Sequence, residues 1–525
     1  MLKNSRAFFY LLAATLFILI SDGLTMRYKV LFGGDEIISF LCATGNADEY
    51  EAVLHKYTPY GKLTDAADWL KYTEITEPNC FNKIGKDLCS NDLHPPLYFW
   101  LLHLFVLKLG VHIFTGILLN LFLQLFSLFF IFKIASLIFA DKNKGAFAAL
   151  IWAISPACMM VSMNARPYEL LELVSIIYLL NFYLWQKKAT KLNAFLLAMI
   201  GTLGLLTNYT FIYFIASCGL FTLIKYKKIG WRNISAFAVA AFISFELMAI
   251  IHPCFADSFA LQQIRAQNFS INELPMRMLK SGLSFMEFLI PVLSLKQPGI
   301  NFSSHKVELF LVIIIGLVEL VPFFWILAKK IFNNGTKTNR LFFDENSKII
   351  FTLFIILSCT ILIPYLFFIT PFHAMGGQYL VFLYPLMAIL FSALLYSFSK
   401  KLQLLFPGIL FAGSICVLMI MIWWNQHSYI HLIEQVQQSK VIVINDLDRR
   451  SFPRLIPYLK PGQQILMDEN ISIENDSLIK TIFIQRPILL ISGNKKIIGK
   501  EISETKQFST YDANDGVVFY CKLFE

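Results

Sequence analysis

The sequence predicts a mainly α-helical protein that crosses a membrane about eleven times and carries a small soluble α/β region at its C-terminal end. Of its 525 residues, 57% are hydrophobic and 15% are charged, whereas globular proteins carry about 25% charged residues. The mean hydropathy is +0.60. Apolar runs of about 20 residues, the length that crosses a bilayer as a helix, recur along most of the chain. The net charge of +10 is spread over short clusters between these runs. Such clusters are typical of cytoplasmic loops and do not indicate nucleic-acid binding.

The first apolar run, from Ala7 to Ile20, follows Lys3 and Arg6, as the apolar part of a secretory signal peptide does. No small-residue cleavage site follows it cleanly, so we interpret it as an uncleaved first span. The predicted spans cover residues 7–24, 113–139, 145–161, 168–185, 192–206, 209–224, 233–252, 306–329, 348–370, 376–397 and 403–424.

Segment 97–111 decides the predicted orientation. A run of about 15 apolar residues is short for a span, and His103 and Lys108 are easier to place near an interface than at mid-bilayer. If the segment is re-entrant or interfacial, the Lys and Arg clusters all fall on one side, as the positive-inside rule requires. These clusters are Lys3/Arg6, Lys142/Lys144, Lys187/Lys188/Lys191, Lys225/Lys227/Lys228/Arg232, Lys329/Lys330/Lys337/Arg340 and Lys400/Lys401. We therefore expect a multi-pass protein of the inner (plasma) membrane, with a cytoplasmic N-terminus and a periplasmic C-terminus.

This orientation places four regions outside the membrane. They are the loop 33–96, the turn 162–167, the loop 253–305 and the tail from about residue 430. Apolar spacing over residues 36–54 and 63–72 predicts helices that lie at the membrane interface. Loop 253–305 is too long for a plain connector, and its apolar residues also favour interfacial helices.

The composition changes near residue 430. We therefore divide the chain into a transmembrane domain, residues 1–430, and a C-terminal domain, residues 431–525. Short apolar runs bounded by turn residues predict strands at residues 441–444, 464–467, 487–491 and 516–520. About 90 residues are just enough for a separate core, so we expect a small soluble α/β domain.

Two adjacent carboxylates, Asp35 and Glu36, follow the first span at the membrane surface. Carboxylates suit a helix N-terminus, so the pair could simply cap an interfacial helix. Alternatively, the pair supplies a general base, because a carboxylate within hydrogen-bond reach can take the proton of an attacking hydroxyl group. The pair alone leaves both interpretations open.

A second polar signal, His94-Pro95-Pro96-Leu97-Tyr98, leads into segment 97–111. The two prolines fix the chain and block a helix before it, which requires nothing more than a rigid stop at the membrane surface. His94 at this corner would face the outer leaflet. An imidazole there can donate to a lipid phosphate or act as an acid or base.

A third signal, Arg166-Pro167-Tyr168, opens a predicted span on the outer side. Proline in the first turn of a helix is ordinary, but an arginine here runs against the inward bias of positive charge. Its planar fork suits a phosphate, and snorkelling to the interface is the alternative. Weaker candidates for ligand contacts are Tyr98, Tyr209, Gln378 and Tyr379.

The nine cysteines show no metal-binding spacing, and a divalent cation stays an open question. Cys80 and Cys89 lie close together in the predicted outer loop. In an oxidising compartment they are free to form a disulfide, worth about 2–3 kcal/mol on the chain-entropy model. The alternative is two buried free thiols. We expect the disulfide.

The three signals, in this order, resemble the lipid-linked-sugar glycosyltransferases of the GT-C fold. The resemblance is to the family 39 branch, related to protein O-mannosyltransferases and the aminoarabinose transferase of lipid A. That family has an acidic pair in its first outer loop, then a His-Pro-Pro-Leu-Tyr element, then an Arg-Pro-Tyr element. The family often has Glu two residues before its Arg, where this chain has Asn164. Many members open a late span with Arg-Tyr, where this chain has Gln378-Tyr379.

The resemblance implies an inverting transfer of a hexose or pentose from a polyprenyl-phosphate donor to a hydroxyl acceptor at the outer membrane face. The acceptor would be a glycan, a lipid or a protein. Asp35 would be the catalytic base, and Glu36, His94, Arg166 and Tyr168 would be site residues. A positive cradle from Arg166 and His94 would stabilise the leaving lipid phosphate. Two other classes stay open, a membrane transporter and a non-catalytic envelope scaffold. A transporter is disfavoured because no inverted repeat or pair of broken helices is visible.

Overall fold

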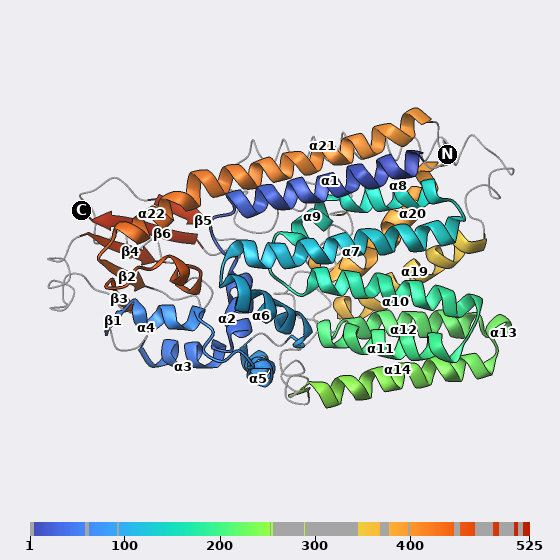
Figure 1. Ribbon diagram of the computed structural model, residues 1–525, viewed down its shortest axis with the longest axis horizontal. Helices are drawn as coiled ribbons and strands as arrows, with labels where there is room; N and C mark the ends of the chain where they lie inside the picture. The colour runs from blue at the N-terminus through green and yellow to red at the C-terminus, as the bar shows by residue number, and fades with distance from the viewer. Residues whose placement is uncertain are drawn as a thin grey trace.

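The computed structural model describes residues 5–57, 62–91, 94–252, 254–255, 288, 345–367, 377–396, 400–445, 452–467, 487–492, 509–512 and 518–524. Long helices form an elongated bundle, and a small sheet lies beyond one end of it (Figure 1). The bundle helices are α1 (Ser5–Tyr28), α7 (Ile113–Phe139), α8 (Lys142–Ala153), α9 (Pro156–Ser162), α10 (Tyr168–Lys187), α11 (Lys191–Thr207), α12 (Phe211–Ile224), α13 (Tyr226–Ile229), α14 (Trp231–Ile251), α19 (Glu345–Phe367), α20 (Tyr384–Tyr396) and α21 (Lys400–Trp424), with the 3₁₀ helix η6 (Gly377–Leu383).

Five helical segments of the described chain are long and apolar enough to cross a membrane. They are Arg6–Tyr28, Ile113–Phe139, Tyr168–Lys187, Trp231–Ile251 and Gln403–Gln438. Helices α8 and α9 make a sixth if they count as one span, bent by 61° where Pro156 prevents a continuous helix. These helices agree with a multi-pass membrane protein. The predicted number of about eleven is not established, and the predicted span 306–329 and most of loop 253–305 lie outside the described residues.

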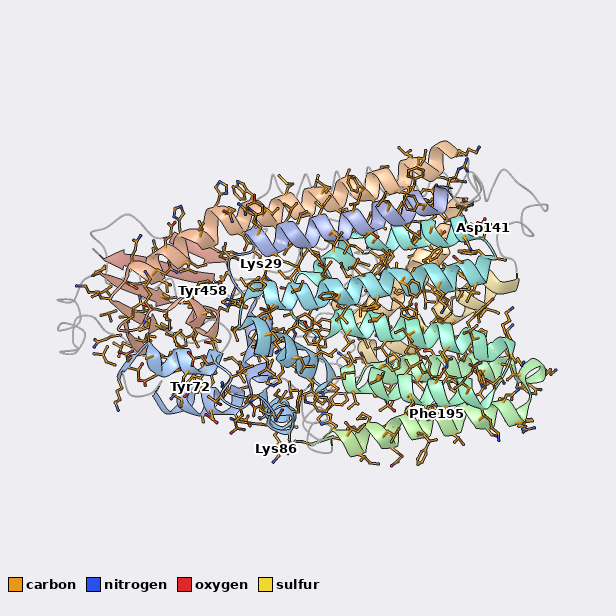
Figure 2. The ribbon with its side chains drawn as sticks, viewed as in Figure 1. Lys29, Tyr72, Lys86, Asp141, Phe195 and Tyr458 are labelled. Atoms are coloured by element: carbon orange, nitrogen blue, oxygen red, sulfur yellow. The ribbon has the colours of Figure 1, made fainter. Side chains whose placement is uncertain are left out.

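The two ends of the bundle differ in the residues they carry. The N-terminus, α13 and Asp141 lie at one end (Figures 1 and 2). Helix α13 contains Lys227 and Lys228, and Asp141 directly precedes Lys142, so this end carries residues of the predicted inner Lys and Arg clusters. Lys29, Tyr458 and the sheet lie at the opposite end. The basic clusters and the sequence signals are therefore separated along the bundle axis. Which end faces the cytoplasm stays a prediction.

The first predicted outer loop folds into short helices at the same end of the bundle as the sheet (Figure 1). They are α2 (Gly34–Thr44), α3 (Ala47–Tyr57), α4 (Ala67–Leu70), the 3₁₀ helix η3 (Lys71–Thr73) and α5 (Phe81–Asn91), followed by α6 (Leu97–Leu109). Helices α3 and α4 lie alongside the sheet (Figure 1). The single helix predicted over residues 36–54 is in fact two helices, because Gly45 adopts a left-handed conformation (φ 73°) that ends α2. The helix predicted over residues 63–72 begins instead as a strand, β1 (Leu63–Asp65). At 13 residues, α6 is about 20 Å long, too short for an ordinary span.

The C-terminal region forms a sheet of six strands in the order β1-β3-β2-β4-β6-β5. Strand β2 pairs in parallel with β3 and β4, and the other pairs are antiparallel. Its own strands are β2 (Val441–Asn445), β3 (Gln464–Met467), β4 (Ile488–Ser492), β5 (Ser509–Asp512) and β6 (Val518–Phe524). Strands β2, β3, β4 and β6 occur at or next to the four segments predicted as strands. Because β1 pairs with β3, the sheet extends across the predicted boundary at residue 430, and a separate domain there stays a prediction.

Candidate active site

The acidic pair lies in the first turn of α2. Glu36 Oε2 accepts a hydrogen bond from the backbone N–H of Gly33, at 2.9 Å, as the carboxylate half of a capping box does. A carboxylate at this position also interacts favourably with the helix dipole. The helix-cap interpretation therefore describes the role of Glu36 at α2.

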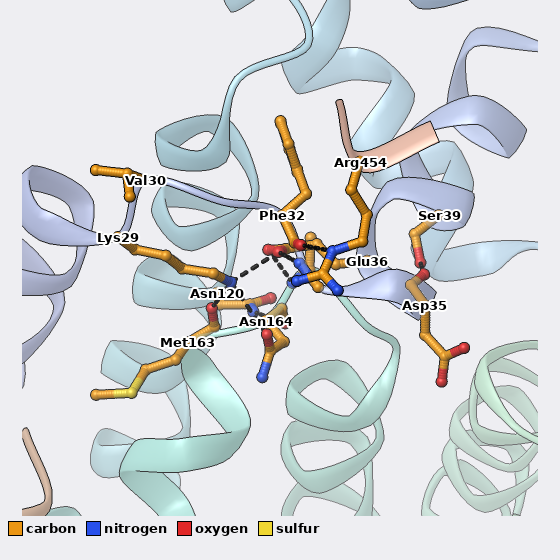
Figure 3. A network of polar contacts seen from close by, with 12 residues as sticks. Lys29, Val30, Phe32, Asp35, Glu36, Ser39, Asn120, Met163, Asn164 and Arg454 are labelled. Atoms are coloured by element: carbon orange, nitrogen blue, oxygen red, sulfur yellow. Dashed lines mark hydrogen bonds and ion pairs between the residues drawn. The ribbon is translucent and has the colours of Figure 1, made fainter. Parts of the chain in front are cut away.

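Glu36 also joins α2 to two distant segments (Figure 3). Its Oε2 pairs with Lys29 Nζ at 2.7 Å, and its Oε1 accepts from the N–H of Ala165 at 3.0 Å. Lys29 Nζ donates in addition to Met163 O at 2.7 Å and to Asn164 Oδ1 at 3.0 Å. Glu36 and Lys29 are only 1% and 8% exposed. Because a buried ion pair persists only when its hydrogen bonds are satisfied, these contacts make Glu36 the centre of a structural junction.

Asp35 has a different environment from Glu36. Its side chain is half-buried, and its carboxylate points away from the junction around Glu36 (Figure 3). Its backbone oxygen is held by two donors, Arg166 Nη1 at 3.0 Å and Ser39 Oγ at 3.1 Å. The backbone of Asp35 is therefore fixed on the side opposite to its carboxylate.

Arg166 packs directly against α2. Its Nη1 donates to Asp35 O and to Ser39 Oγ, both at 3.0 Å, and the residue is 7% exposed. The guanidinium is thus bonded within the protein and does not extend to the membrane interface as a snorkelling arginine would. Arg166 precedes Pro167, the N-cap of α10. The third sequence signal is therefore brought to the first, from 131 residues away.

The second signal lies beside the third. The His94 ring is 6.4 Å from the ring of Tyr168, at 86°. Tyr98 is fully buried, and its hydroxyl donates to Asn120 Oδ1 at 3.1 Å. Asn120 Nδ2 in turn donates to the carbonyls of Ser162 and Asn164. Tyr98 thus supports the turn before Arg166 from within the protein, and its role as a ligand contact stays a prediction.

Sequence reasoning missed Lys29 and Asn120. Lys29 directly follows the first span on the side predicted to be outside, so it breaks the positive-inside rule as Arg166 does. Asn120 is a polar residue inside the apolar run 113–139, a position where a polar side chain normally has a specific partner. Both signals were present in the sequence.

The weaker candidates lie on other elements. The Tyr209 hydroxyl is 2.7 Å from His252 Nε2, and the two rings stack at 6.0 Å. This pair joins the turn between α11 and α12 to the end of α14. Burial lowers the pKa of His252 to about 4. Gln378 and Tyr379 belong to η6, and their side chains lie outside the described part of the structure.

The predicted disulfide between Cys80 and Cys89 is not formed, because helix α5 separates the two residues. Both cysteines are buried and neither is in a disulfide. Cys80 directly precedes α5 and Cys89 lies in its last turn, so nine residues of helical rise place them about 13 Å apart. A disulfide requires Cα atoms within about 7 Å. Cys80 Sγ instead lies 3.8 Å from His103 Nδ1, and Cys89 Sγ donates to Gly85 O.

Among the residues that the structure describes, no group of three or more His, Cys, Asp or Glu side chains is arranged to hold a metal ion. The chemistry that the described residues themselves supply is one outward-facing carboxylate, one buried guanidinium against the same helical turn, and one imidazole nearby.

Comparison with known proteins gives a partial match to a family model and a likeness in fold. Residues 93–252 match the family model described as dolichyl-phosphate-mannose-protein mannosyltransferase. His94, Tyr98, Arg166 and Tyr168 lie within this match, and the acidic pair precedes it. No curated protein sequence matches the chain.

Two solved structures of ArnT from Cupriavidus metallidurans resemble this chain. The crystal structure bound to undecaprenyl phosphate has a TM-score of 0.55 at 10% sequence identity and covers 99% of this chain and 98% of that chain. The apo state has a TM-score of 0.46 at 12% identity and covers 91% and 98%. The first of these and the family match confirm the resemblance inferred from the sequence: the chain has the fold of the GT-C lipid-linked-sugar glycosyltransferases.

Proposed function

We propose that this protein transfers a sugar from a polyprenyl-phosphate donor to a hydroxyl acceptor at the outer face of the membrane, with Asp35 as the general base. One observation carries the assignment of the base. Asp35 presents its carboxylate away from the polar junction, whereas three donors of the chain occupy the carboxylate of its neighbour Glu36. The commitment of the Glu36 carboxylate to these donors supports Asp35, rather than Glu36, as the base of the acidic pair.

The reaction follows from these positions. Asp35 takes the proton of the acceptor hydroxyl as its oxygen attacks the anomeric carbon. The bond from that carbon to the phosphate oxygen breaks, and the lipid phosphate leaves as an anion. Attack opposite the leaving group inverts the anomeric configuration. Arg166, held beside Asp35, supplies positive charge that stabilises the leaving phosphate. His94 and Tyr168 pack against each other at the start of α10, next to Arg166.

The donor class rests on the family and the fold. The family match names a mannosyltransferase that uses a dolichyl-phosphate donor, and the ArnT structure of the same fold holds undecaprenyl phosphate. A donor with a long lipid tail is approached from within the bilayer, and its phosphate lies at head-group depth. We propose a hexose or pentose as the transferred group and a glycan, lipid or protein of the cell envelope as the acceptor.

Reconstituted enzyme provides the test. Purified wild-type protein in nanodiscs is incubated with a panel of undecaprenyl-phosphate sugars and with envelope extract from a deletion strain. Mass spectrometry then follows release of undecaprenyl phosphate and the mass added to the acceptor. Transfer that depends on Asp35 supports the proposal. Absence of transfer with every donor, together with an unaltered envelope in the deletion strain, would favour the transporter or scaffold classes.

The proposed orientation is tested separately. A reporter that is active only in the periplasm, fused after Glu525, should be active. Activity of a cytoplasm-only reporter at the same position would place the site on the wrong side of the membrane for this donor.

A further inference from the structure

The segment between α1 and α2 carries the chain from the membrane bundle to Asp35. Residues 29–33 form no helix or strand, so their backbone polar groups cannot be satisfied by regular structure. We call these residues, with Tyr28 at the end of α1, the entry strap. Glu36 holds the two ends of this strap together, because its Oε2 accepts from both Lys29 Nζ and Gly33 N.

The other side of the entry strap is held by residues about 400 positions later in the chain. Asn425 Oδ1 accepts from Val30 N at 3.2 Å, and Gln426 Nε2 donates to Tyr28 O at 3.2 Å. Both belong to the π-helical turn η7 (Asn425–Tyr429). The Tyr458 hydroxyl, from the 3₁₀ helix η9 (Ile456–Tyr458), donates to Val30 O. Four side-chain bonds, counting that of Arg454, thus reach the backbone of the strap.

Arg454 makes the contact nearest to the site. It lies in the 3₁₀ helix η8 (Phe452–Arg454), is only 1% exposed, and donates from Nε to Phe32 O at 2.6 Å. Lys29 and Arg454 approach Glu36 from opposite sides (Figure 3). Burying a guanidinium is costly, and here its donated bond fixes the residue directly before Gly33, the N-cap of α2.

A second attachment holds the same part of the chain to the loop that follows α2. Strand β1 pairs with β3, and Ala66 N donates to Gln463 O at 2.8 Å. The ring of Trp69 packs edge-on against Phe452 at 4.9 Å, two residues before Arg454. Residues 425–445 and 452–467 therefore contact the chain both before and after α2.

We propose that residues 425–445 and 452–467 together are a positioning element for the active site, and that Arg454 is its principal positioning residue. By fixing Phe32 O, Arg454 sets where α2 begins and hence the direction in which Asp35 points. This inference rests on the proposed function of Asp35. Because misplacing a catalytic group by about 1 Å can cost about 100-fold in rate, loss of this contact reduces turnover, while the donor-binding side chains His94, Arg166 and Tyr168 remain on other elements.

Steady-state kinetics of full-length protein in nanodiscs tests the role. Arg454→Ala should lower kcat by about tenfold or more and leave the donor KM within about twofold, and Arg454→Lys should recover part of the loss. The matched control is Lys460→Ala. Lys460 is a cation of the same region whose Nζ donates to Gln437 O on the exposed surface, so its removal should change neither constant. An unchanged kcat in Arg454→Ala, or a loss confined to KM, would overturn the proposal.

Hydrogen–deuterium exchange gives a readout that needs no activity. Peptides covering residues 28–44 should exchange faster in Arg454→Ala and, to a smaller extent, in Tyr458→Phe, and at the wild-type rate in Lys460→Ala. Unchanged exchange in both Arg454→Ala and Tyr458→Phe would refute the positioning role. If Arg454→Ala does not fold, Arg454→Lys and Tyr458→Phe carry both measurements. If the wild-type protein transfers no sugar, the proposed function fails, and exchange still decides whether the segment orders α2.

Discussion

The two sides of the first turn of α2 have opposite surroundings. Consecutive residues of a helix point about 100° apart, so Glu36 turns into the protein and Asp35 turns away from it. On the inner side, Lys29, Gly33 and Ala165 saturate one carboxylate. On the outer side, a half-buried carboxylate faces away from that junction. Glu36 and Asp35 carry the same charge and differ by one methylene group. Glu36 holds the α1–α2 segment and the turn before Arg166 together, and Asp35 acts on the acceptor in the mechanism proposed above.

The largest effect should come from the outer side. Asp35→Asn keeps the shape of the side chain but removes the proton acceptor, so we expect kcat to fall by at least about 100-fold, the scale usual for loss of a general base, with donor binding nearly intact. Isotope release from a labelled donor measures turnover. Asp68→Asn, which changes an exposed acid of the same loop, is the control. Near-normal turnover in Asp35→Asn would show that Asp35 is not the base and would make Glu36 the candidate.

The inner side should respond in stability. Lys29→Met leaves the Glu36 charge buried without its ion pair, a change that costs about 3–5 kcal/mol. The matched control is Lys83→Met, which breaks the pair of Lys83 with Glu49. That pair is 2.8 Å long, its side chains are 35% and 61% exposed, and such a pair is worth about 0–1 kcal/mol. Thermal unfolding in detergent compares them. The Lys29→Met/Glu36→Gln double variant should recover much of the loss, and equal shifts for the two single variants would contradict the junction.

Tyr98 distinguishes support from ligand contact. Tyr98→Phe removes the hydrogen bond to Asn120 Oδ1 and should cost about 1 kcal/mol of stability, without a change in donor KM at saturating acceptor. Thermal unfolding and donor titration on the same preparation measure both quantities. A raised donor KM with unchanged stability would restore Tyr98 as a ligand contact.

The sequence predicts the features that depend on neighbouring residues. The acidic pair in a first helical turn, the prolines before α6 and the strands of the C-terminal region all follow from local rules, and the structure contains them. The failures also have local causes. Gly45 ends α2 early, and the unforeseen helix α5 holds Cys80 and Cys89 apart.

The different roles of Asp35 and Glu36 could not be predicted in the same way. They depend on Lys29 meeting Met163 from 134 residues away, and on Arg454 meeting Phe32 from 422 residues away. Only tertiary structure brings these residues together. In the sequence, such residues can be recognised only as charged or polar residues at positions where apolar or neutral residues are usual, as with Lys29 and Asn120.

Asp87 is a second buried carboxylate to compare with Glu36, and its burial should make stability depend on pH. Burial and the nearby Asp48 carboxylate raise the pKa of Asp87 to about 7, from 3.8. Because ionisation is harder in the folded state, the contribution of Asp87 to stability is complete below about pH 4 and is lost as the pH rises towards 7. Asp87→Asn should remove this loss, so the stability of the variant relative to the wild type should rise as the pH goes from 4 to 7. An unchanged slope in thermal unfolding from pH 4 to 7 would contradict it.

His252 should give the smallest effect, with the opposite sign. Burial lowers its pKa from 6.5 to about 4, so its contribution to stability is complete above about pH 6.5 and is lost as the pH falls towards 4. Between about pH 4 and 6.5, the Asp87 contribution lowers stability as the pH rises, and the His252 contribution lowers stability as the pH falls. Because the two contributions have opposite slopes, they largely offset each other in the wild type. His252→Gln should remove the acid-side loss and leave the fall in stability with rising pH that Asp87 causes. The double variant with Asp87→Asn should return to a profile about as shallow as that of the wild type. In Tyr209→Phe the imidazole stays buried, so the acid-side loss should persist. Its disappearance there would show that the Tyr209 hydroxyl, rather than burial, keeps His252 neutral.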